Sequence, residues 1–232
     1  TDGTKLYDDG EKKTWKELFK KFAVEKDVEP GRIGIIGATP LEFGGIYEED
    51  FLKKYFAEKS FSKVVCYGMG DGLDAVREAA AAEKNIVVSP AGIAAAKYLQ
   101  QKFGTPYELF CPPEIIPEWK EKKEQIAGLL NVEELSEKKI LIVHQQVLAN
   151  TLREEFISAN INVASWFMMN KEQKKEQDIL FKEEDDWITY IKENEYDIII
   201  ADPLLKKAVP FYKGEWYDLP HFAISGKKRQ SV

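Results

Sequence analysis

Eight short, unbroken apolar runs, separated by longer amphipathic segments, constrain the fold of this chain more than any other feature. Each run is four to six residues long, and they cover residues 32–36, 63–67, 85–89, 107–110, 139–143, 162–167, 178–181 and 197–201. Strands that are buried on both faces have this pattern, and such strands are typical of parallel sheets.

Helical spacing fills the intervals between the runs. Apolar residues recur at helical intervals, or residues with high helix propensity cluster, over residues 12–24, 47–59, 72–83, 91–102, 146–159 and 185–193. The segment 72–83 contains the alanine run from Ala79 to Ala82. Alternation of strands and helices predicts an α/β protein whose parallel strands are joined by crossover helices.

A segment rich in proline and charge divides the apolar runs into two sets of four. Residues 113–137 include Pro113 and Pro117 and then a charged stretch, which predicts a connecting helix and linker. We expect a Rossmann-like domain with an N-terminal helix over residues 1–112 and a second over residues 138–232. Each should hold a parallel sheet of four to five strands flanked by helices.

Composition narrows the function classes. The chain has 33 Lys and Arg against 40 Asp and Glu, a net charge of −7, which argues against a nucleic-acid partner. Its apolar runs are far shorter than the roughly 20 residues that a membrane helix needs. Two cysteines fit a reducing compartment, so we expect a cytoplasmic protein. The polar start is not a signal peptide, and Thr1 in place of Met indicates processing or part of a longer protein.

Glycine-rich loops follow three predicted strands of the first domain, at the edge where open parallel sheets bind ligands. The loops cover residues 37–45, 68–72 and 89–92. We predict a ligand in the cleft between the domains, lined by Gly37, Thr39, Gly68, Gly70, Ser89 and Gly92. Helices starting near Gly72 and Ala91 favour an anion, such as a tetrapyrrole carboxylate, a phosphate or an acidic cofactor. The alternative is that these loops are the turns that every βαβ unit needs.

Nucleotide motifs are incomplete in these loops. Gly68, Gly70 and Gly72 do not make the dinucleotide fingerprint, because that motif needs glycine where Leu73 stands. The loop at 37–45 has neither the spacing nor the lysine of a P-loop. A tight strand-to-helix turn is the favoured interpretation of the second loop.

Few side chains suggest chemistry on their own. Cys66 and Cys111 each lie near the end of a predicted strand; buried free thiols are the favoured interpretation, and a metal site the weaker one. His144 and His221 follow strand or turn signals and are either hydrogen-bonded structural residues or strand-end ligands and proton donors. Asp202 precedes Pro203, which indicates a turn first and an active-site carboxylate second. The charged runs at 171–176 and 182–186 are interpreted as solvated faces.

Four stretches resemble nitrogenase component 1-type oxidoreductases. They are IGIIGATPLEFGG at 33–45, AVREAAAAEKNIVVSPAGIAAAKYLQQKFGTPY at 75–107, KILIVHQQVLANTLREE at 139–155, and YDIIIADPLLKKAVP followed by DLPHFAISG within 196–226. Each is weak alone, but together they span most of the chain in the expected order. The resemblance implies three Rossmann-like domains per subunit, of which this chain is similar to the second and third. The family's first domain, which holds the cysteines of the relay cluster, has no counterpart here.

The sequence departs from the family pattern at the metal ligands. Ser89 stands at the position of the cofactor cysteine of the molybdenum–iron subunit, and Arg229 at that of its cofactor histidine. The resemblance therefore implies no metal or cofactor in this chain, whereas an iron–sulfur cluster is possible in the full-length protein. Its partners would be a nitrogenase reductase-like iron protein and a homologous component 1 subunit, in a homo- or heterodimer.

Two functions follow from this resemblance. The first is an oxidoreductase subunit that accepts electrons from the ATP-dependent iron protein and reduces an unidentified substrate. The second is a non-catalytic scaffold that binds a metallocluster precursor or a tetrapyrrole. Suitably spaced cysteines upstream, or a neighbouring gene for an iron-protein homologue, would favour the enzyme.

Overall fold

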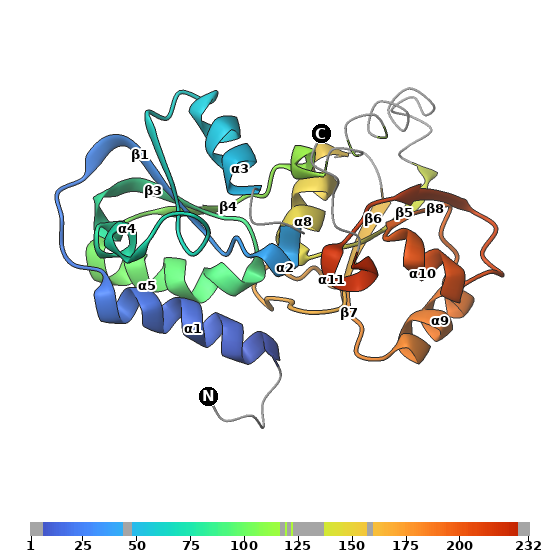
Figure 1. The fold of residues 1–232 in the computed structure, drawn as a ribbon. Coiled ribbons are helices and arrows are strands. Elements are labelled where there is room, and N and C mark those ends of the chain that lie inside the picture. Colours follow the sequence, from blue (N-terminus) through green and yellow to red (C-terminus); the bar gives the residue numbers. More distant parts are fainter. Residues whose placement is uncertain are drawn as a thin grey trace. The chain divides into compact units, whose positions relative to one another are not determined.

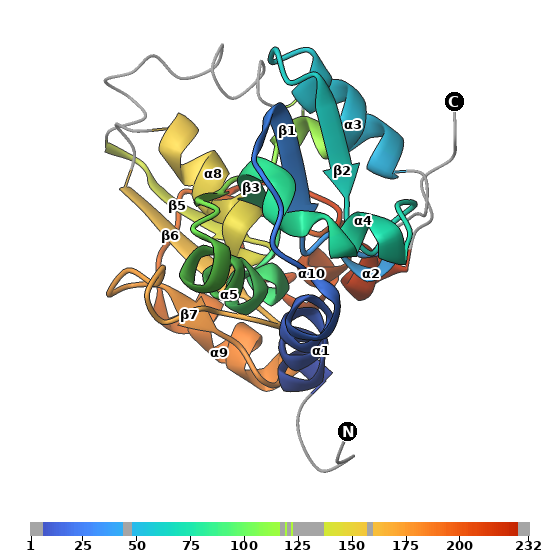
Figure 2. The same ribbon diagram turned by 90° about the vertical axis from the view of Figure 1, so that its left-hand side faces the viewer.

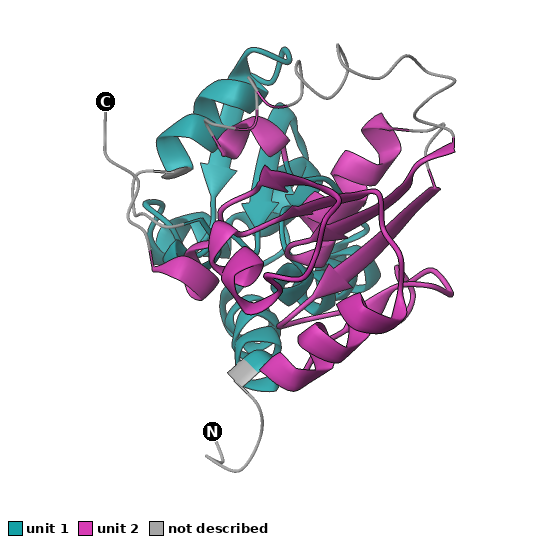
Figure 3. Cartoon of the chain, turned by 90° about the vertical axis from the view of Figure 1, so that its right-hand side faces the viewer, with its two compact units in different colours: residues 1–111 teal, residues 112–232 magenta. Residues whose placement is uncertain are grey.

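The structure, a computed structural model, describes residues 7–43, 48–116, 119, 122, 137–156 and 160–226 (Figure 1). The chain forms two compact units, residues 1–111 and 112–232, each with its own sheet (Figure 3). Most of the connecting segment predicted at 113–137, together with Arg229, lies outside the described residues.

The first unit carries a four-stranded parallel sheet in the order β2-β1-β3-β4. Helices α1 and α5 pack together on one face, and α3 lies on the other (Figures 1 and 2). Its elements are α1 (Tyr7–Phe22), β1 (Glu29–Ile36), α2 (Pro40–Phe43), α3 (Glu48–Ala57), β2 (Lys63–Cys66), α4 (Leu73–Arg77), η1 (Ala79–Ala81), β3 (Ala82–Val87), η2 (Pro90–Gly92), α5 (Ile93–Phe103) and β4 (Tyr107–Leu109).

The second unit carries a five-stranded parallel sheet in the order β7-β6-β5-β8-β9. Its elements are η3 (Pro113–Ile115), β5 (Lys139–Val143), α8 (Gln146–Glu155), β6 (Asn160–Ser165), β7 (Ile179–Leu180), α9 (Glu184–Glu193), β8 (Ile198–Ala201), α10 (Pro203–Ala208), β9 (Glu215–Asp218) and α11 (Phe222–Ser225). The predicted fold class, two parallel sheets of four and five strands flanked by helices, is confirmed.

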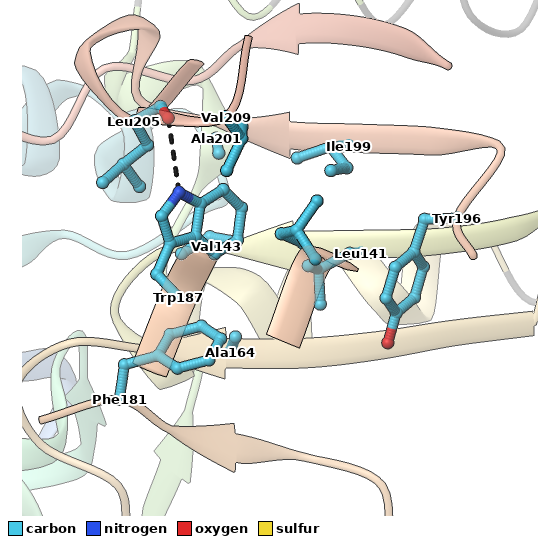
Figure 4. Packing of buried hydrophobic residues seen from close by; sticks show 11 residues of the cluster. Leu141, Val143, Ala164, Phe181, Trp187, Tyr196, Ile199, Ala201, Leu205 and Val209 are labelled. Atoms are coloured by element: carbon cyan, nitrogen blue, oxygen red, sulfur yellow. Dashed lines mark hydrogen bonds between the residues drawn. The ribbon is translucent and has the colours of Figure 1, made fainter. Parts of the chain in front are cut away.

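Alternate residues of the central strands form the core beneath α9 and α10. Leu141, Val143, Ile199 and Ala201 point to this face and are fully buried. The Trp187 ring packs among them, and its Nε1 donates a hydrogen bond of 3.3 Å to the carbonyl of Leu205 (Figure 4). This bond gives the buried indole N–H a partner and ties α9 to α10.

Two local predictions differ from the structure. The helix expected over 72–83 ends at Arg77; η1 follows, and Ala82 starts β3, where it pairs with Glu29. All four alanines are buried, so their packing between the elements outweighs the helix propensity of alanine. Strand β9 is a ninth strand beyond the eight predicted runs, and its only partner strand is β8 within the described sheet.

Candidate functional site

The strand orders place one topological switch point in each sheet. In the first sheet it lies between β1 and β3, whose carboxyl ends lead to Gly37 and Ser89. In the second it lies between β5 and β8, whose carboxyl ends lead to His144 and Asp202. Ligands of open parallel sheets bind at such points, because the loops there diverge and leave a crevice.

The switch point of the first sheet is closed by its own residues. The buried Ser89 hydroxyl donates a hydrogen bond of 2.6 Å to the Gly37 carbonyl. A Cβ on Gly37 would lie 2.7 Å from Ser89 Oγ, and one on Gly92 would lie 2.9 Å from the Ile36 carbonyl oxygen. The structure therefore brings these three predicted site residues together. The space beside each glycine, where a side chain would lie, is occupied by other residues of the same unit.

The loop after β2 packs against helices of the same unit. A Cβ on Gly68, which has a φ of +78°, would lie 2.6 Å from the Trp15 ring of α1. A Cβ on Gly70 would overlap the Glu49 carboxylate of α3. These glycines allow close packing of side chains from α1 and α3. The helix that follows, α4, is only five residues long, so the positive electrostatic potential of its dipole at the N-terminus is small.

Thr39 differs from the other predicted loop residues. Its carbonyl accepts hydrogen bonds from the backbone of Glu42 and Phe43, which starts α2. Its hydroxyl is buried and has no hydrogen-bond partner among the described residues. The anion site predicted at this edge stays a prediction.

At the edge of the second sheet, Asp202 joins two helices. Its Oδ1 accepts a hydrogen bond of 2.8 Å from the Leu204 N–H and so caps α10. Its Oδ2 accepts one of 2.8 Å from the His221 N–H at the start of α11. Asp202 is fully buried and both oxygens are engaged, so the carboxylate fixes the positions of α10 and α11.

The two histidines meet at this edge. The His144 and His221 ring centroids are 4.4 Å apart, and the Phe167 ring lies 5.4 Å from that of His221. Nε2 of His144 lies 3.3 Å from the Pro220 carbonyl oxygen, and Nδ1 of His221 accepts a hydrogen bond from the Ala223 N–H. Both side chains are buried, so the rings form a wall that supports Phe167.

A pocket of about 340 Å³ opens beside this wall. Its lining comes from the segments that follow β6 and β7 and from helices α9, α10 and α11: Trp166, Phe167, Lys182, Glu184, Leu204, Leu205, Ala208 and Ile224. Six of these side chains are apolar or aromatic, whereas the charged Lys182 and Glu184 are exposed. Small-molecule sites commonly have this form, with apolar walls and few polar groups.

Comparison with known proteins identifies the family. The family model for Nitrogenase component 1 type Oxidoreductase matches residues 4–164. The chain belongs to this family. A solved chain described as nitrogenase Cp1 at pH 6.5 shares the fold with a TM-score of 0.59 and 11% identity over 92% of this component 1-type chain. The match covers 58% of that solved chain. No curated protein matches.

Two described candidate ligands, Cys66 and Ser89, are poorly suited to hold a component 1 cofactor. The pKa of the Cys66 thiol is raised to about 12 by burial and by the Glu49 carboxylate, which opposes the thiolate that a cluster needs. Ser89 uses its hydroxyl within the fold. Among the described residues, no group of three or more His, Cys, Asp and Glu side chains could hold a metal ion.

Sequence reasoning located part of this edge and missed the pocket. His144, His221 and Asp202 were candidate residues, and the structure brings them to one place. Trp166 and Phe167 fall in a run predicted to be a strand, and Lys182 and Glu184 in a run predicted to be a solvated face, yet all four residues line the pocket. The signal for the second edge is the segment 202–205 directly after β8, because ligands of parallel sheets bind at the carboxyl ends of the strands.

Proposed function

We propose that this chain is the substrate-binding part of a component 1-type oxidoreductase subunit. Electrons would come from an ATP-dependent iron protein through clusters held outside these 232 residues. The substrate would be an organic molecule with a flat apolar body, bound in the pocket at the carboxyl edge of the second sheet. Family membership supports the reaction class, and the pocket carries the proposal.

Two features of the pocket support an organic substrate. The Trp166 and Phe181 rings pack with centroids 5.4 Å apart, and Phe167 is held against His221, so the aromatic wall is pre-formed. Pre-formed apolar surfaces bind flat apolar molecules without a cost of ordering side chains. Thiolate ligands are not provided at this edge, because neither cysteine lies in the second unit.

An assay with the full-length protein, its partner subunit and a reduced iron-protein homologue tests the proposal. We expect MgATP-dependent oxidation of the iron protein. Ala208→Trp, which fills the pocket, should abolish substrate reduction and leave this oxidation unchanged. Ala57→Trp, at an exposed position of α3, is the matched control and should leave both unchanged. Absence of ATP-dependent oxidation would contradict the proposal and favour a scaffold.

A further inference from the structure

The two charged residues of the pocket lining have opposite charges and stand on either side of one residue. Lys182 and Glu184 both line the pocket, whereas Glu183 between them is not part of the lining. The backbone of Glu183 is extended, with φ −128° and ψ 155°. In extended backbone the residues before and after a given one lie on the same side, with Cα atoms about 6.6 Å apart. One small molecule in the pocket can therefore reach both charges.

The start of α9 fixes the backbone that carries these two side chains. Oδ2 of Asp186 accepts hydrogen bonds of 3.1 Å from the N–H groups of Lys182 and Glu183. Glu184 is itself the first residue of α9. A ligand that contacts Lys182 and Glu184 thus has to order only their side chains and not the backbone of this segment.

Neither charge is used within the described parts of the fold. The side chains of Lys182 and Glu184 form no ion pair there, with each other or with any other described residue, and both are exposed. The remaining lining is apolar or aromatic. The pocket therefore combines an apolar wall with one free cation and one free anion.

We propose that the substrate of this pocket is a zwitterion with a small flat apolar body, of the class of the aromatic α-amino acids. This inference rests on the proposed function and names the substrate class of the same site. The substrate carboxylate pairs with Lys182, its ammonium group pairs with Glu184, and its ring lies against the apolar lining. The volume of about 340 Å³ is near the lower end of the range for ligand pockets, which fits a body of one or two fused rings.

The pair of opposite charges favours a zwitterion over a ligand with a single charge. An anion is attracted by Lys182 but repelled by Glu184, and a cation meets the reverse. A zwitterion pairs with both, because an α-amino acid carries its ammonium and carboxylate groups on one carbon. Ion pairs at exposed positions are weak, so we expect each pair to change the Kd by about two- to fivefold.

Isothermal titration calorimetry of the full-length protein with probes that share an indole ring tests this inference. The probes are L-tryptophan, 3-indolepropionate, tryptamine and indole, which carry both charges, the carboxylate alone, the ammonium alone and neither. We expect L-tryptophan to bind most tightly. Lys182→Met should weaken binding of L-tryptophan and 3-indolepropionate but not of tryptamine. Glu184→Gln should weaken binding of L-tryptophan and tryptamine but not of 3-indolepropionate. Lys174→Met and Glu195→Gln, at exposed positions outside the lining, are the matched controls and should change no Kd.

The outcomes separate this inference from the proposed function on which it rests. Equal binding of all four probes, or an unchanged Kd of L-tryptophan in Lys182→Met and Glu184→Gln, would overturn the zwitterion. If Ala208→Trp abolished binding in that case, the pocket would still be the site of an apolar substrate. Binding that survives Ala208→Trp, or no binding of any probe, would contradict both proposals.

Discussion

Glu11 on α1 lies in a group of carboxylates whose burial has a consequence for stability. Its pKa is raised from the usual value of 4.5 to about 7, first by burial and then by the charges of Glu42 and Asp8. The folded state therefore binds more protons than the unfolded state between these two values. We expect the free energy of unfolding to increase as the pH falls from about 8 towards 4.5.

Urea unfolding at a series of pH values measures this dependence. Glu11→Gln should flatten the slope, whereas Glu17→Gln, at an exposed position of the same helix, should leave it unchanged. An equal slope in wild type and Glu11→Gln would contradict the expectation.

Asp178 is a buried carboxylate that links α8, β6 and the loop before β7 in the second unit. Its Oδ1 accepts hydrogen bonds from Arg153 Nη1 at 2.7 Å and from the Val163 N–H, and its Oδ2 accepts one from the Lys175 N–H. Asp178→Ala leaves the buried Arg153 without its carboxylate, so we expect a loss of about 3–5 kcal/mol of unfolding free energy. The exposed Asp74 pair with Arg77 is the comparison: Asp74→Ala should have little effect. Equal effects in chemical denaturation would contradict this assignment.

At the scale of elements, Asp202 couples α10 to α11. Asp202→Ala removes the cap of α10 and the acceptor of the His221 N–H, and we expect it to cost about 2–4 kcal/mol. Hydrogen exchange should show faster exchange at the Leu204 and His221 amides. Asp202→Asn keeps one acceptor oxygen for Leu204, so its protection should persist while that of His221 falls. Equal protection losses at both amides in Asp202→Asn would contradict the separate roles of the two oxygens.

Strands were predicted well where an unbroken apolar run indicates burial on both faces of the sheet. Residues 139–143 and 197–201 are unbroken apolar runs, and they form β5 and β8 with every residue of β8 buried. The prediction was wrong for Ala79–Ala82, because alanine fits both a helix and a tightly packed turn, and only tertiary contacts decide between them. Short edge strand β9 has no such apolar run: its sequence is EWYD, with no fully buried residue.

At the scale of the whole molecule, the site was less predictable than the fold. The pocket draws on residues from 166 to 224, which approach one another only through the order of strands in the sheet. Strand order is not encoded in the local pattern that identifies a strand. The surroundings of the glycines in the first unit could not be predicted for a related reason: Gly37 adjoins Ser89 and Gly70 adjoins Glu49, which are distant in the sequence.

Iron content tests the assignment of clusters to other parts of the protein. After anaerobic incubation with iron and sulfide, the 232-residue chain should contain no stoichiometric iron and show no sulfur-to-iron absorption. The reason is the raised pKa of Cys66 and the internal hydrogen bond of Ser89. Tightly bound iron that is lost in Cys66→Ala or Cys111→Ala would show that these thiols do ligate a cluster.

Anomalous diffraction from crystals soaked in 4-iodophenol is the most direct test of the proposed substrate site. This probe has a flat apolar body and one polar end, as the lining of the pocket requires. We predict an iodine peak between Phe167 and Leu204 in the wild type, and its absence in Ala208→Trp crystals of the same form. Iodine peaks elsewhere with an empty pocket, or an unchanged peak in Ala208→Trp, would contradict the assignment of the substrate site to the second unit.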